Sequence, residues 1–102
     1  MSGNPALYPR AAQALRKALR LDPGNASAIR GLSALAASRH RFQESLVLAK
    51  RAHALEPEVA AVYGLIGDAS LELGRYREAF AAFDRMAALK PSTNAYARIS
   101  YA

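Results

Sequence analysis

Residues 55–91 read LEPEVAAVYGLIGDASLELGRYREAFAAFDRMAALKP, and this stretch begins and ends with a leucine, a charged residue and a proline. The same three-residue pattern occurs at residues 21–23, so prolines stand at the equally spaced positions 23, 57 and 91. Other positions recur at this interval: Tyr8, Phe42 and Tyr76; Ile29 and Tyr63; Leu32 and Ile66; Ala18, Ala52 and Met86. So many positions in phase indicate an internal repeat, whose period is the spacing of the prolines.

Apolar residues between the prolines follow the spacing of α-helices. Ile29, Leu32 and Leu35 are three residues apart, which places them on one face of a helix. Alanine, the strongest helix former, accounts for 24 of the 102 residues. Asn25 is suited to cap the start of one helix, and Gly74 to end another in a left-handed conformation. The sequence predicts no strands and six helices, at residues 5–21, 26–38, 42–55, 59–73, 76–89 and 93–102.

The second full repeat carries a specific set of residues, namely Tyr63, Ile66, Gly67, Gly74, Arg75, Tyr76, Ala79, Phe83, Leu89 and Pro91. This set resembles the tetratricopeptide repeat, a helix–turn–helix unit of the same period. The resemblance implies an all-α fold in which antiparallel helix–turn–helix repeats stack as a right-handed α-solenoid of about six helices. Signature residues of this kind are packing residues, so the match predicts the fold more directly than the function.

The resemblance covers essentially the whole chain and predicts a single domain over residues 1–102. Its expected parts are the second half of a repeat at 3–25, full repeats at 26–59 and 60–93, and the start of a further repeat at 94–102. The first full repeat matches less well, because Ser33 replaces the glycine and His40 stands where Gly74 stands in the next copy.

Small and aromatic residues predict how the helices pack. We expect Gly67 and Ser33 to be small because two helices approach closely at these positions. The aromatic residues of the second repeat are expected to fill the space between successive hairpins. These residues are Tyr63, Tyr76, Phe80 and Phe83.

Composition excludes several classes of protein. The chain contains no cysteine, which excludes disulfide bonds, thiolate metal sites and cysteine nucleophiles. No apolar run approaches the roughly 18 residues that a membrane-spanning helix needs, and no signal peptide is visible at the start. We therefore expect a cytoplasmic protein that does not act on membranes.

Candidate catalytic and metal-binding residues are few. His40 and His53 are the only histidines, and their spacing does not match a metal-binding motif. The glycines are isolated, so no phosphate-binding loop is expected. Glu56 and Glu58 flank a proline between two predicted helices and do not form a catalytic pair. We predict a protein without enzymatic activity, cofactor or metal.

The resemblance implies that the first helix of each repeat lines a concave groove, where related proteins bind an extended peptide or a partner helix. The last repeat requires a register one residue shorter, because Tyr96 follows Pro91 by five residues whereas Tyr63 follows Pro57 by six. The candidate site for a peptide or protein partner then comprises Ser27, Arg30, Asp68, Leu71, Asn94, Arg98 and Tyr101.

One specialised function of the family is not expected here. Members that clamp the C-terminal carboxylate of a chaperone resemble one another in two groove asparagines and several basic residues. Arg30 and Arg98 match the basic positions, but Ala34 and Leu65 stand where the asparagines belong. Two hydrogen-bond donors are therefore missing.

Charge and the chain ends leave alternatives open. Residues 1–51 hold nine Arg and Lys and two acids, whereas residues 52–102 hold five and six. The basic half could bind nucleic acid or an acidic surface, although its cations are not interleaved with aromatics and we do not expect nucleic-acid binding. A structural spacer in a longer array is a third possibility. We also expect end-to-end self-association, because the first and last predicted helices each expose an apolar stripe. The stripes are Leu7, Ala11, Leu15 and Leu19 at one end and Tyr96, Ile99 and Ser100 at the other.

Overall fold

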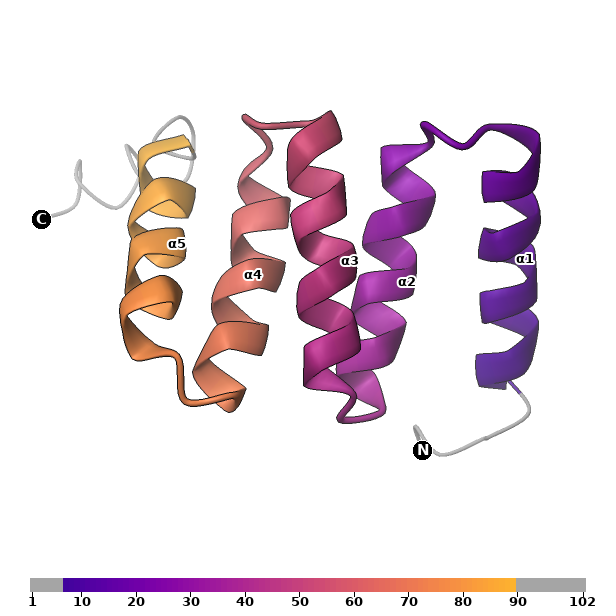
Figure 1. Ribbon diagram of the computed structural model, residues 1–102. Helices are drawn as coiled ribbons and strands as arrows, with labels where there is room; N and C mark the ends of the chain where they lie inside the picture. The colour runs from indigo at the N-terminus through magenta and orange to yellow at the C-terminus, as the bar shows by residue number, and fades with distance from the viewer. Residues whose placement is uncertain (1–6, 90–102) are drawn as a thin grey trace, which may run out of the picture.

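A computed structural model describes residues 7–89 of the chain. This part contains five α-helices and no strand (Figure 1), and the helices are α1 (Leu7–Leu21), α2 (Ala26–Ser38), α3 (Phe42–Leu55), α4 (Ala60–Glu72) and α5 (Tyr76–Leu89). The predicted all-α fold is confirmed. The helix predicted at 59–73 is one residue shorter at each end, because Val59 is extended at the N-cap. The helix predicted at 93–102 lies outside the described residues.

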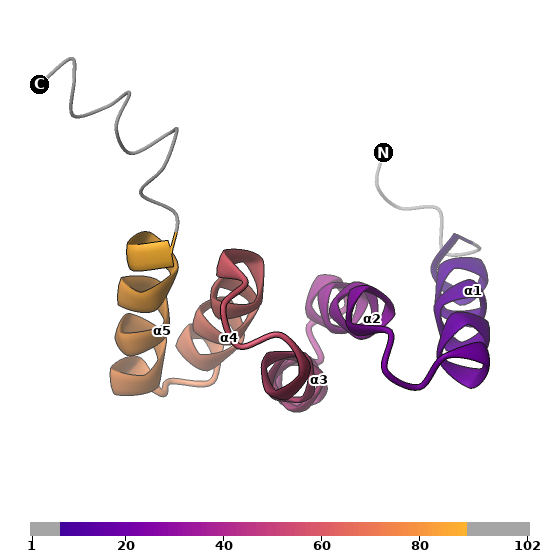
Figure 2. The same ribbon diagram turned by 90° about the horizontal axis from the view of Figure 1, so that it is seen from above.

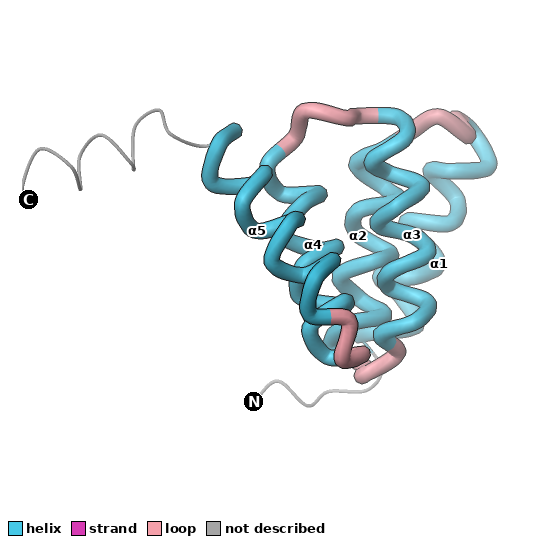
Figure 3. The backbone as a smooth tube through the Cα atoms, turned by 60° about the vertical axis from the view of Figure 1, so that its left-hand side comes forward, coloured by secondary structure: helices cyan, strands magenta, loops and turns pink. Residues whose placement is uncertain are grey.

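The five helices form a curved row of antiparallel neighbours (Figures 1 and 2). The turns within repeats lie at one end of the helices, along one edge of the row, and the connections between repeats lie along the opposite edge (Figure 3). Seen from above, α2 and α4 lie on one side of the row and α3 on the opposite side (Figure 2). This arrangement is the stacked α-solenoid that the repeat pattern predicts. None of the described helices is long and apolar enough to cross a membrane.

The helix ends follow from local sequence. Asn25 Oδ1 accepts a hydrogen bond of 3.0 Å from the backbone N–H of Ala28, which confirms the predicted N-cap. Gly74 adopts φ of 79°, and the N–H of Arg75 donates to the carbonyl of Ser70 at 2.8 Å to close the end of α4. His40 adopts the same left-handed conformation, with φ of 60°.

The core consists largely of alanine and other small residues, so the helices approach closely. Ser33 and Ser45 are fully buried, and the Ser33 hydroxyl donates to the Ser45 carbonyl oxygen at 2.8 Å. One hydrophobic cluster joins Ile29, Ala52 and Val62 across three helices. Because each hairpin buries its apolar face against its neighbour, the repeats stabilise one another.

At one contact between the two helices of a repeat, the two full repeats divide the space differently between a small and a larger side chain. A Cβ atom at Gly67 would collide with the ring of Phe83, so α4 needs a glycine where this ring packs. One repeat earlier, the same two positions hold Ser33 and Ala49, both fully buried. The small residue on the first helix therefore compensates for the larger residue on the second.

Two expectations about apolar residues are wrong. Tyr76 and Phe80 do not fill space between hairpins but are 58% and 59% exposed. The counterpart of Phe80 one repeat earlier, Leu46, is 1% exposed because α4 covers that face of α3, and no described helix covers the equivalent face of α5. Leu15 and Leu19 of α1 are half-buried rather than exposed, because α2 packs against them.

Candidate interaction surface

Exposed residues recur along α2 and α4 at helical spacing and form a surface that we call the inner face. Its members are Ser27, Ala34, Ala61, Asp68 and Leu71, all of them exposed. α2 and α4 contact each other, so their exposed stripes are neighbours. Ala37 and Gly64, half-exposed, lie within the same stripes. The inner face is thus lined mostly by small side chains. It also carries the carboxylate of Asp68 and, one turn further along α4, the side chain of Leu71.

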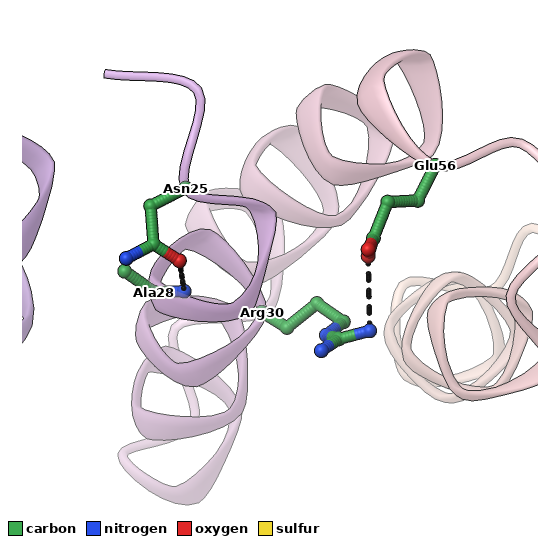
Figure 4. Close-up of polar contacts among 4 residues, drawn as sticks. All are labelled: Asn25, Ala28, Arg30 and Glu56. Carbon is green, nitrogen blue, oxygen red and sulfur yellow. Dashed lines mark hydrogen bonds and ion pairs between the residues drawn. The ribbon is translucent and has the colours of Figure 1, made fainter. Parts of the chain in front are cut away.

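Arg30 lies at the edge of the inner face and is held by an ion pair. Its Nη1 atom donates to Glu56 Oε1 at 2.9 Å, and both side chains are partly buried (Figure 4). Glu56 is the C-cap residue of α3, so the pair ties α2 to the connection between repeats. Sequence reasoning assigned Glu56 to a linker and missed this contact. The neighbouring repeat offers no signal for it, because the two equivalent positions hold Gly64 and Lys90.

The predicted binding residues are only partly described. Ser27, Asp68 and Leu71 are exposed on the inner face, whereas Arg30 is already engaged by a carboxylate. Asn94, Arg98 and Tyr101 lie outside the described residues. The groove and its seven residues remain a prediction.

Cations gather on the other layer of helices. Within the five described helices, α1, α3 and α5 together carry eight basic residues (Arg and Lys) and three acidic residues (Asp and Glu). In contrast, α2 and α4 together carry one basic residue and two acidic residues. We call the surface of α1, α3 and α5 that faces away from α2 and α4 the outer face. Two of its carboxylates are paired, since Glu44 lies 3.8 Å from Arg41 and Glu78 lies 3.3 Å from Lys50.

A cluster around Tyr63 joins α3, α4 and α5. The Tyr63 hydroxyl donates to the Pro57 carbonyl oxygen at 2.9 Å. A phenol has one proton to donate, so the 2.9 Å contact between Tyr63 Oη and His53 Nε2 is a hydrogen bond donated by the histidine. The Arg85 guanidinium carbon lies 5.6 Å from the centre of the Tyr63 ring, within cation–π range. No sequence signal predicted this cluster, because His53 has no counterpart in the repeat pattern: the equivalent positions hold Leu19 and Ala87.

The histidines take structural roles in the described part of the chain. His53 is bound to Tyr63, and His40 packs edge-on against Phe42 with 5.6 Å between ring centres. Within residues 7–89, no three His, Asp or Glu side chains are grouped closely enough to hold a metal ion.

Comparison with known proteins gives two matches. A family model described as tetratricopeptide repeat matches residues 36–100. The Hsp70-Hsp90 organizing protein of Triticum aestivum is 35% identical to this chain over 85 residues. That alignment covers 83% of the chain and 15% of the wheat protein, so the chain is similar to a small part of this relative.

Proposed function

Because the chain belongs to the tetratricopeptide repeat family, we propose that it is a non-enzymatic interaction module that binds a peptide or partner protein on its inner face. The wheat relative is named for organising Hsp70 and Hsp90, which supports a role in assembling proteins. The binding residues that we propose within the described part are Ser27, Asp68 and Leu71, with Arg30 at the edge.

The observation that carries this proposal is the exposed stripe of small residues shared by α2 and α4. Ala34 and Ala61 let a partner backbone approach the helices closely, because they project little beyond the helix surface. Asp68 makes no ion pair or hydrogen bond with any described residue, so its carboxylate is free to accept hydrogen bonds from a partner. Leu71 is 39% exposed and offers an apolar contact.

The mode of binding that we propose differs from capture of a C-terminal carboxylate. Ala34 and Leu65 cannot donate the hydrogen bonds that such capture needs, and Arg30 is already paired with Glu56. A free carboxylate at Asp68 would also repel the negative end of a chain. These residues favour a partner segment that crosses the inner face and presents backbone N–H groups or a cation to Asp68.

Selection from a random peptide library displayed on phage tests the proposal. Peptides that bind the wild-type chain are then measured by fluorescence anisotropy against Asp68→Lys, Leu71→Asp and, as a matched control at an exposed position of α5, Arg77→Asp. We expect the two inner-face substitutions to weaken binding about tenfold or more, the effect of about 1.4 kcal/mol, and the control to change it little. A library that yields no binder, or binders that tolerate both inner-face substitutions, would contradict the proposal.

A further inference from the structure

A hollow opens on the outer face between α3 and α5, where α4 lies between them (Figure 1). It has a volume of about 420 Å³. Ile66 and the ring of Tyr63 line it from α4, and Ala81 and Ala82 line it from α5. At the preceding junction, the counterparts of Lys50, Ile66 and Glu78 surround a cavity of about 40 Å³. The two junctions are lined by equivalent repeat positions but differ in open space.

Side-chain size explains why this hollow is open. Ala81 and Ala82 occupy the positions that Val47 and Leu48 occupy one repeat earlier. Leu48 packs against the hydrophobic cluster, so its side chain fills the space that an alanine leaves empty. The hollow therefore has an apolar floor and wall that can receive an aliphatic side chain.

The rim of the hollow is charged, and its cations outnumber its acids. Lys50 and Glu78 form an exposed ion pair across it at 3.3 Å. Because Glu78 is engaged by Lys50, Arg85 has no carboxylate partner among the described residues and rests on the Tyr63 ring instead. A ligand with a carboxylate beside its apolar group would give Arg85 the partner that it lacks.

The cation at this position continues along the outer face. Lys17, Arg51 and Arg85 are each one repeat length from the next, so α1, α3 and α5 carry a cation at the same place. All three side chains are exposed, and none forms an ion pair with a described residue. A segment that leaves the hollow along the row would meet further cations in register with the repeats.

We propose that the outer face binds an acidic, extended protein segment, which inserts one apolar side chain into the hollow and sets its carboxylates against Arg85 and the row of cations. A nucleic acid fits less well, because Arg85 already covers the Tyr63 ring that a base would stack on. A flat membrane fits less well, because the row of helices is curved and cannot meet one plane along its length (Figure 2). This surface is separate from the inner face.

The test uses a fluorescein-labelled peptide with one leucine between two pairs of aspartates. Binding to the full chain is measured by anisotropy at low ionic strength. Ala82→Leu copies the preceding repeat and narrows the hollow, and Arg85→Gln removes the cation that has no ion-pair partner among the described residues. We expect each to weaken binding about tenfold or more. The matched controls Ala88→Leu and Arg77→Gln, at exposed positions of the same helix outside the lining, should bind as the wild type does.

Variant peptides and a variant of the inner face separate the remaining outcomes. A peptide with serine in place of the leucine, and one with lysines in place of the aspartates, should each bind more weakly. Asp68→Lys on the inner face should not weaken binding, which separates this proposal from the proposed function. The inference is overturned if the acidic peptide does not bind below about millimolar concentration, or if both Ala82→Leu and Arg85→Gln bind it normally. It is likewise overturned if a single-stranded oligonucleotide binds the hollow more tightly.

Discussion

Replacing Gly67 by alanine adds one methyl group at the tightest contact between α4 and α5. A Cβ atom there would lie 2.7 Å from Cδ1 and 2.8 Å from Cζ of Phe83, and closer still to Cε1. These distances are well below ordinary van der Waals separation, and the neighbour is a rigid aromatic ring rather than the end of a flexible side chain. The ring, or the whole of α5, must therefore move.

The expected magnitude is the difference of two opposing effects. Overpacking of a core contact costs about 1–3 kcal/mol. Alanine in a helix interior gains back about 1 kcal/mol relative to glycine, because glycine loses more backbone freedom on folding. We expect Gly67→Ala to lower the free energy of unfolding by up to about 2 kcal/mol, and each kcal/mol lowers the unfolding midpoint temperature by about 4–8 °C.

Urea and thermal unfolding followed by far-ultraviolet circular dichroism measure this loss. Gly64→Ala is the matched control, since it makes the same change in the same helix but meets the flexible sulfur of Met86 at 3.2 Å. The control should be neutral or slightly stabilising. If Gly67→Ala proves as stable as the wild type while Gly64→Ala does not gain on it, the account of this contact is wrong.

Three further predictions concern single side chains. His40→Gly should raise the free energy of unfolding by about 0.5–1 kcal/mol, because it relieves a left-handed conformation that costs a non-glycine residue about 1–2 kcal/mol. Urea unfolding measures this gain. The control Arg39→Gly, at a residue with negative φ, should lower the free energy of unfolding. Ser70→Ala should be neutral or stabilise the protein by about 1 kcal/mol, because the buried Ser70 hydroxyl has no hydrogen-bond partner among the described residues. Ser33→Ala should instead destabilise it by about 1 kcal/mol, because it removes a buried hydrogen bond. Calorimetry distinguishes the two outcomes. Phe80→Asp should weaken any self-association seen by sedimentation, because Phe80 is a large exposed aromatic on a face of α5 that no other described helix covers. An equal effect of Gln43→Asp on α3 would argue against that surface.

Features that depend on neighbours in sequence were predictable. The N-cap at Asn25 and the left-handed end of α4 at Gly74 require only local geometry. His40 occupies the position equivalent to Gly74 one repeat earlier and adopts the same left-handed conformation. The helix bounds follow from the same local signals. Periodicity therefore predicts both the fold and the layer on which each helix lies.

Features that depend on how two repeats meet were not predictable in the same way. Arg30 and Glu56 are far apart in the sequence and meet because α2 packs beside α3, so that Arg30 reaches the C-cap residue of α3 (Figure 4). Tyr76 and Phe80 are large apolar residues and were predicted to lie in the core. Leu46, at the same repeat position as Phe80, is indeed buried. Whether such a residue is covered depends on the next helix along the row, and the residue itself carries no signal of it.

Comparison of equivalent positions gives a way to separate structure from function in this chain. Where a position only supports packing, a change in one side chain is answered by a change in its partner, as Ser33 with Ala49 becomes Gly67 with Phe83. At Ala81 and Ala82, the loss of the larger side chains Val47 and Leu48 leaves a hollow of about 420 Å³ that none of its described lining residues fills. The cation beside it is kept in all three outer helices, as Lys17, Arg51 and Arg85. An unfilled apolar space beside a repeated, unpaired charge has no packing explanation, and this combination is what directs the search for a partner to the outer face as well as to the inner one.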